Sequence, residues 1–158
     1  MNHKKLPNKN YLNKILLYKE GKIYWKKTKK EAGYIRKDGY STICINKSLY
    51  QTHRIIYAMF FCDPGFMIID HINGIQNDNR IENLRSVSQK INCQNRHSCS
   101  SNNKEKILGV RFHNQSKKYQ ARITIDKKCI SLGYFINSID AKNAYIDAKR
   151  KYHKGCTI

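Results

Sequence analysis

The stretch "DHINGIQNDNRIENLR", Asp70 to Arg85, decides how the centre of this chain is interpreted. It is polar almost throughout, and asparagine occupies positions 73, 77, 79 and 83. Short amide side chains bond to their own backbone and shape turns, so the bland interpretation is a surface loop. The Asp70-His71 pair at its start makes the same loop a candidate for chemistry.

The segments on either side predict regular elements around this loop. "FMIID" (66–70) is a short β-type run, "LRSV" (84–87) can pair back with it, and "SQKINCQN" (88–95) reads as a short helix that contains Asn92. Neighbouring strand residues point to opposite faces, so only a strand end that opens into a loop lets Asp70 and His71 address one site. The centre therefore predicts strand, long loop, strand, helix.

Three side chains of this centre suit metal-assisted hydrolysis of a phosphodiester. The Asp70 carboxylate is a hard oxygen ligand of the kind Mg²⁺ prefers, and Asn92 could add an amide oxygen if its helix folds back over the hairpin. His71 would then act as the general base, because an ordinary histidine is mostly neutral at physiological pH.

Upstream, residues 1–49 predict a short helix followed by hairpins, with turns at Gly21 and at Asp38-Gly39. The run "THRIIYAMFF" (52–61) predicts a helix capped by Thr52, with an apolar face made of Ile55, Ile56, Met59 and Phe60. At its start, His53 and Arg54 could contact a phosphate near the site or pack against the strands, and both interpretations stay open.

Downstream, "SCSSNNKEK" (98–106) is small, polar and without periodicity, which predicts a linker. Three strand-like segments follow at 109–113, 119–125 and 129–135, and then a helix from 138 to 153 capped by Ser138. We predict an α+β chain with four parts: an N-terminal part (1–49), a central module (50–97), the linker (98–106), and three antiparallel strands on one helix (107–158).

The charge of the chain points to a polyanionic partner. Thirty-one Lys and Arg face 11 Asp and Glu, a formal net charge of +20. The longest apolar run is too short to cross a bilayer and the N-terminus lacks a signal-peptide core, so we expect a soluble, intracellular protein without a membrane partner. Six irregularly spaced cysteines predict free thiols, and zinc at Cys93, His97 and Cys99 is the weaker alternative.

The central motif resembles the HNH endonucleases, in particular the phage and intron-encoded homing type with asparagine in place of the last histidine. The resemblance covers roughly residues 50–95 and lies in Asp70-His71, Gly74, "DNRIENL" and Asn92, in that order. It implies a ββα-metal fold, with Asp70 and Asn92 as metal ligands, His71 as the base, and Asn83 as a brace of the loop. It also implies in-line attack of water on phosphorus, leaving a 5′-phosphate and a 3′-hydroxyl.

The C-terminal part resembles the Apetala-type (ethylene-response-factor) DNA-binding domain. "GV", "ARI", "LGYF" and the alanine-rich helix with Tyr145 carry this resemblance. It implies that the sheet lies in the major groove of double-stranded DNA. The residues expected to face DNA are Arg111, Lys117, Lys118, Tyr119, Arg122 and Lys128.

We therefore predict a DNA endonuclease that uses Mg²⁺ or another divalent cation such as Mn²⁺. One site per chain predicts nicking by a monomer, and cleavage of both strands if two copies act on the DNA. A DNA-binding regulator that keeps the fold without the activity is the main alternative, and a basic RNA-binding protein is a third.

Overall fold

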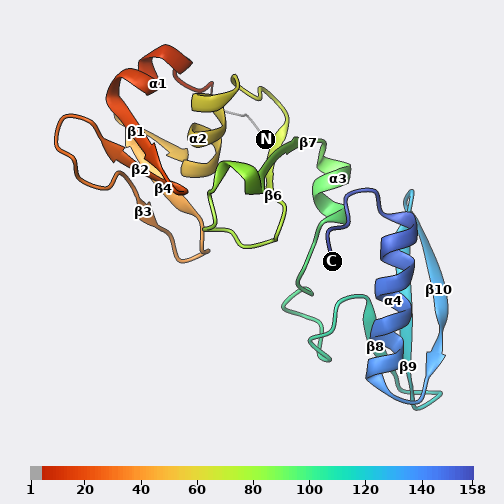
Figure 1. Cartoon of the computed structure of the whole chain (residues 1–158). Coiled ribbons are helices and arrows are strands. Elements are labelled where there is room, and N and C mark those ends of the chain that lie inside the picture. The colour runs from red at the N-terminus through yellow and green to blue at the C-terminus, as the bar shows by residue number, and fades with distance from the viewer. Residues whose placement is uncertain (1–4) are drawn as a thin grey trace. The chain divides into compact units, whose positions relative to one another are not determined.

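The computed structural model describes residues 5–158 and divides into two compact units, one ending at Gln89 and one comprising Lys90–Ile158 (Figure 1). The predicted linker at 98–106 thus lies inside the second unit. The reason is that the segment after Gln89 packs with the C-terminal residues; the backbone N–H of Gly155, for example, donates to Oε1 of Gln94 at 3.1 Å.

The first unit begins with small antiparallel sheets and two helices. Strands β1 and β2 form one hairpin, and β3, β4 and β5 form a three-stranded sheet. Isoleucines and leucines from these elements and from α2 share one core that also includes Ile69 and Leu84. The elements are α1 (Lys9–Ile15), β1 (Leu16–Lys19), β2 (Lys22–Trp25), β3 (Tyr34–Ile35), β4 (Ser41–Ile45), β5 (Ser48–Gln51) and α2 (Thr52–Phe60).

Helix α2 differs from its prediction at both ends. Thr52 is its first helical residue and not its cap, because the Thr52 hydroxyl is 2.7 Å from the hydroxyl of Ser41 on β4. Ile55, Ile56 and Met59 are buried as predicted, whereas Phe60 is exposed and its ring packs edge-on against Tyr18.

The centre folds as the sequence predicts. Strand β6 (Ile68–His71) pairs antiparallel with β7 (Leu84–Val87), and the short 3-10 helix η1 (Ile81–Asn83) closes the loop between them. Helix α3 (Gln89–Gln94) follows at once. The order strand, long loop, strand, helix is confirmed.

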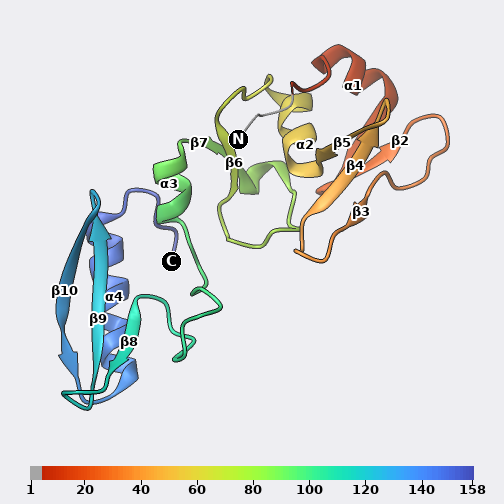
Figure 2. The ribbon, with the colours of Figure 1, turned by 180° about the vertical axis from the view of Figure 1, so that it is seen from behind.

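The second unit is a three-stranded sheet in the order β10-β9-β8, covered on one face by α4 (Figures 1 and 2). Its elements are β8 (Val110–His113), β9 (Lys118–Ile125), β10 (Lys128–Phe135) and α4 (Ser138–Tyr152). Ala121 and Ile123 pack against Ala141 and Tyr145 in a separate core. The predicted cap of α4 is displaced by one residue, because the side chain of Asn137 accepts from the backbone N–H of Asp140 at 2.8 Å.

The chain is therefore α+β, as predicted. Among residues 5–158, the helices are all too short or too polar to cross a bilayer.

Candidate functional site

Asp70 and His71 lie at the end of β6, where the strand opens into the long loop. In the register of the hairpin, Asp70 stands opposite Arg85 and His71 opposite Leu84. Oδ2 of Asp70 accepts hydrogen bonds from Nε and Nη2 of Arg85 at 3.0 and 2.9 Å. Asp70 and His71 are both buried, so their side chains are held by protein groups rather than by bulk water.

Arg85 was not predicted as a site residue, although the predicted pairing of the two strands already places it opposite Asp70. Once "FMIID" and "LRSV" are paired, a cationic side chain lies across from the candidate ligand. Because the guanidinium donates two hydrogen bonds in a fixed geometry, it sets the orientation of the Asp70 carboxylate.

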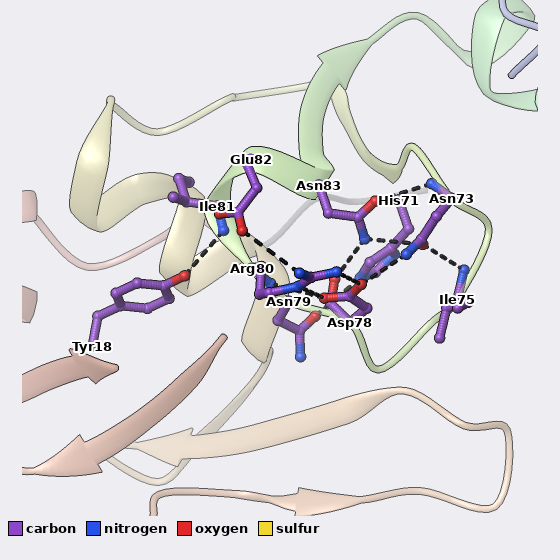
Figure 3. A network of polar contacts seen from close by, with 10 residues as sticks. All are labelled: Tyr18, His71, Asn73, Ile75, Asp78, Asn79, Arg80, Ile81, Glu82 and Asn83. Carbon is purple, nitrogen blue, oxygen red and sulfur yellow. Dashed lines mark hydrogen bonds and ion pairs between the residues drawn. The ribbon is translucent and has the colours of Figure 1, made fainter. Parts of the chain in front are cut away.

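The side-chain partner of His71 is Asn79, a residue that the sequence pattern predicted to shape a turn. Nε2 of His71 is 3.0 Å from Oδ1 of Asn79, and both residues are buried (Figure 3). An amide oxygen only accepts hydrogen bonds, so Nε2 must carry the proton. In the neutral ring this leaves the lone pair on Nδ1.

Asn83 crosses the loop with three hydrogen bonds (Figure 3). Its Oδ1 accepts from the backbone N–H of Asn73 at 3.0 Å, and its Nδ2 donates to Oδ1 of Asn73 at 3.0 Å and to the carbonyl of Asp78 at 2.7 Å. Asn73 also accepts from the backbone N–H of Ile75, the local turn expected of a short amide. Asn83 thus joins the two ends of the loop that begins at His71.

Asp78 and Arg80 form an ion pair in the same loop, with Nη2 of Arg80 2.7 Å from Oδ2 of Asp78. Hydrogen bonds from Arg80 hold the pKa of the Asp78 carboxyl well below its usual range, and burial acts weakly against them.

The N-terminal part, to which the sequence assigned no role, supports this loop. The hydroxyl of Tyr18 accepts from the backbone N–H of Ile81 at 3.1 Å (Figure 3). Gly21, at φ +82°, packs so closely that a Cβ there would lie 2.9 Å from the backbone nitrogen of Arg80. The ring of Tyr40 lies 6.1 Å from that of His71.

His53 and Arg54 are both internal to the first unit. The ring of His53 packs edge-on against His71, with 4.9 Å between the ring centroids. Burial, with smaller effects of His71 and Arg54, lowers the pKa of His53 to about 3. Its Nδ1 is buried and has no hydrogen-bond partner among residues 5–158. Arg54 donates to the carbonyls of Met67 and Gly65 at 2.9 and 3.0 Å, so its guanidinium braces the loop before β6.

Asn92 lies on α3, which is held by residues far along the chain. The hydroxyl of Thr157 donates to Oδ1 of Asn95 at 2.6 Å, and Nζ of the buried Lys149 donates to the carbonyl of Arg96. A Cβ on Gly155 would lie 2.3 Å from the carbonyl oxygen of Ile91. We call these residues, Lys149, Gly155 and Thr157, the α3 clasp. Asn92 and Asp70 belong to different units.

The residues expected to face DNA do not all lie on one side of the second unit. Side chains alternate along β9, so Lys118 and Arg122 lie on the face opposite α4, while Ala121 and Ile123 are buried beneath the helix. Tyr119 is on the face covered by α4, where its ring packs edge-on against Phe112. It therefore does not share the open face with Lys118 and Arg122. Lys117, in the turn before β9, and Lys128, at the start of β10, are exposed.

A cleft of about 1360 Å³ lies within the second unit. Its charged lining is mainly basic, with Glu105 and Asp126 as the acidic members. The cationic lining residues are Lys90, Arg96, Lys104, Arg111, Arg122 and Lys127. This excess of positive charge suits a polyanion.

Comparison with known proteins gives three findings. Residues 50–94 match the family model of the HNH endonucleases. A relative, DNA endonuclease I-HmuI of Bacillus phage SP01, is 34% identical over 110 residues, which cover 65% of this chain and 62% of the relative. A solved structure described as DNA binding and cleavage by the HNH homing endonuclease I-HmuI aligns with a TM-score of 0.41 and 36% identity, covering 48% of this chain and 47% of that one.

The chain thus spans about three fifths of the length of the relative it matches. The matched segment contains the strand end, the braced loop and α3, with Asp70, His71, Asn83 and Asn92 all inside it. Residues 50–94 thus match the HNH endonuclease family model, and the chain is similar to a phage DNA endonuclease.

Proposed function

We propose that this protein is a divalent-metal-dependent endonuclease that cuts phosphodiester bonds in double-stranded DNA. The observation that carries the proposal is the end of β6, where a carboxylate and an imidazole adjoin in a loop whose hydrogen bonds fix both. Asp70 is oriented by Arg85, and His71 by Asn79. The HNH match over the same residues and the similarity to a phage DNA endonuclease support it.

His71 acts as the general base in this proposal. With its proton held at Nε2 by the Asn79 oxygen, the neutral ring accepts a proton from water at Nδ1. Deprotonated water is the nucleophile that the phosphorus atom requires. In-line attack then leaves a 5′-phosphate and a 3′-hydroxyl.

The donor atoms fit a hard divalent cation such as Mg²⁺ or Mn²⁺. Carboxylate and amide oxygens are suitable ligands, and the chain offers the oriented Asp70 carboxylate together with Asn92 in the matched segment. Both residues would hold the ion, which would stabilise charge developing on the phosphate and the leaving oxygen. Asn83 keeps the loop in the shape that presents Asp70 and His71 together.

The second unit would place the nuclease on DNA. Its sheet, open on one face and covered by α4 on the other, is the arrangement that the Apetala-type resemblance of residues 107–158 implies. Arg111, Lys118 and Arg122 on the open face, with Lys117 and Lys128 at its turns, would contact the DNA. A single nuclease segment addresses one strand, so a monomer nicks, and two copies are needed to cut both strands.

Supercoiled plasmid tests the proposal directly. Incubation with Mg²⁺ should convert it to the nicked circle, and EDTA should prevent this. Asp70→Asn should be inactive at the same protein concentration, because an amide replaces the carboxylate ligand. If the wild-type chain binds DNA tightly but leaves plasmid supercoiled across Mg²⁺ and Mn²⁺, the endonuclease proposal is wrong and the regulator alternative takes its place.

A further inference from the structure

A row of polar side chains crosses the sheet of the second unit on the face opposite α4. Arg111 of β8 pairs in register with Gln120 of β9, and Gln120 pairs with Tyr134 of β10. Arg111 and Tyr134 are exposed, but Gln120 between them is only 8% exposed. A buried amide is unusual at this position, because polar side chains on the open face of a sheet normally contact solvent.

Gln120 is buried because its amide joins three neighbours. Its Oε1 accepts from Nε of Arg111 at 2.8 Å, and its Nε2 donates to the hydroxyls of Ser131 and Tyr134 at 3.2 and 3.1 Å. A guanidinium only donates, so the amide oxygen must be the atom that faces Arg111. The orientation of the amide is thereby settled by its partners.

This contact restricts how Arg111 can present its charge. The guanidinium is planar and rigid, so a hydrogen bond through Nε also fixes the direction of the edge that carries Nη1 and Nη2. Among residues 5–158, the bond to Gln120 is the hydrogen bond that the Arg111 side chain makes. The terminal nitrogens Nη1 and Nη2 of Arg111 thus form a pair of parallel hydrogen-bond donors with a fixed direction, at an exposed position.

Such a fork matches one base in duplex DNA better than the others. In the major groove guanine shows two adjacent acceptors, N7 and O6, whereas adenine shows one acceptor beside an amino donor. Two parallel donors complement guanine and meet the adenine amino group unfavourably. A phosphate also accepts two hydrogen bonds, but it carries no sequence information.

We propose that Gln120 is a positioning residue that holds Arg111 for recognition of one guanine in the target DNA, an inference that rests on the proposed DNA-binding role of this unit. Lys118 and Arg122 lie on the same face of β9, and among residues 5–158 no side chain braces them as Gln120 braces Arg111, so in this proposal they contact phosphates whatever the sequence. Sequence preference and general affinity therefore reside in different side chains of one sheet.

Selection of bound sites from a pool of random duplexes tests this with the full chain, in EDTA so that DNA is not cut. The wild-type chain should enrich sites with one strongly preferred G·C pair. Arg111→Ala should lose the preference at that pair, by roughly 5- to 150-fold in relative affinity, the range for a bidentate contact. Gln120→Ala, which keeps Arg111 but releases it, should lose most of the same preference at the same pair.

Two matched variants separate orientation from charge. Gln120→Glu keeps an acceptor for Nε of Arg111 and adds a negative charge, so it should retain the preferred pair with weaker affinity for every sequence. Lys118→Ala should also weaken all sequences alike and keep the preferred pair. Thermal unfolding of each variant checks that the second unit remains folded.

The outcomes distinguish this inference from the function on which it rests. If Gln120→Ala, still folded, selects the wild-type site with undiminished preference, or if the wild type selects no site while binding duplexes, the positioning role is wrong. Tighter binding to single-stranded RNA than to any duplex overturns it as well. Failure of the wild-type chain to bind DNA at all would overturn the proposed function and this inference together.

Discussion

Two imidazoles lie 4.9 Å apart in the first unit, and their surroundings give them different roles. His71 has a hydrogen-bond acceptor at Nε2, which orients its ring. His53 is buried, its Nδ1 has no hydrogen-bond partner in the part of the chain that the structure describes, and its lowered pKa keeps the ring neutral beside His71. Each role leads to a separate measurement.

Replacing the base tests His71. His71→Ala should lower plasmid nicking by at least about 100-fold, the range for loss of a general base, while the affinity for DNA stays within about twofold of the wild type. Asn77→Ala, an exposed position in the same loop, is the matched control and should cut normally. A large loss of DNA affinity in His71→Ala would instead mark the residue as structural.

Acid titration of stability tests His53. Its pKa in the folded protein is about 3, against 6.5 for an ordinary histidine, so between these pH values the unfolded chain binds a proton that the native state does not. The free energy of unfolding therefore decreases as the pH is lowered from about 6.5 towards 3. In urea titrations across this window, His53→Leu should show a weaker decrease than the wild type. Equal pH dependence in the two proteins would contradict a neutral, buried His53.

At the scale of elements, the loop between β6 and β7 contacts the β1-β2 hairpin through Tyr18 and Gly21. Gly21→Ala combines two costs: φ +82° disfavours any Cβ, and the Cβ would lie 2.9 Å from the backbone of Arg80. Gly65→Ala is the matched control, because Gly65 also has a positive φ but, apart from its chain neighbours, none of the described residues has an atom within 4 Å of its Cβ position. Gly65→Ala should cost about 1 to 2 kcal/mol in stability. Gly21→Ala should cost more and also reduce nicking, and equal effects of the two would mean that the hairpin does not position the loop.

Helix α3 has only six residues, so it depends on tertiary support. The α3 clasp supplies that support. Gly155→Val should force the tail away from Ile91, and hydrogen exchange of the α3 amides should become at least tenfold faster, with a loss of nicking. Lys151→Ala, an exposed position on α4, should leave both unchanged. Normal exchange in Gly155→Val would show that α3 is held by other contacts.

At the scale of the whole molecule, the net charge of +20 should govern the proposed binding to DNA. Each phosphate contact adds about 0.9 to the slope of log affinity against log salt. Replacing both Lys118 and Arg122 by alanine should therefore make the slope shallower by up to about 1.8. A titration from low to moderate salt measures this, and an unchanged slope would remove these residues from the DNA contact. Deleting residues 103–158 would be a poorer test, since it also removes the α3 clasp.

The sequence predicted those elements whose patterns are local. The hairpins, the order of elements around "DHINGIQNDNRIENLR", and the sheet with its helix all follow from periodicity and turn residues over short distances. It did not predict contacts between distant segments. Asn79 was expected to shape a turn and contacts His71, eight residues earlier, instead. Lys149, which no sequence pattern singled out, is buried, and its Nζ donates to the carbonyl of Arg96. The Lys149–Arg96 contact spans 53 residues, and in neither case does the sequence pattern indicate the partner, because the partner is chosen by the fold.

The distance along the chain between α3 and its clasp has a consequence during translation. Thr157 follows its partner Asn95 by 62 residues, so the ribosome completes β6, its loop and α3 well before the clasp has been synthesised. In a nascent chain, α3 and its Asn92 therefore wait for the segment that fixes them. If the proposed function holds, a ribosome-bound fragment carries the complete loop after β6 but lacks a fixed α3, and nicking activity should appear only when the second unit has been completed.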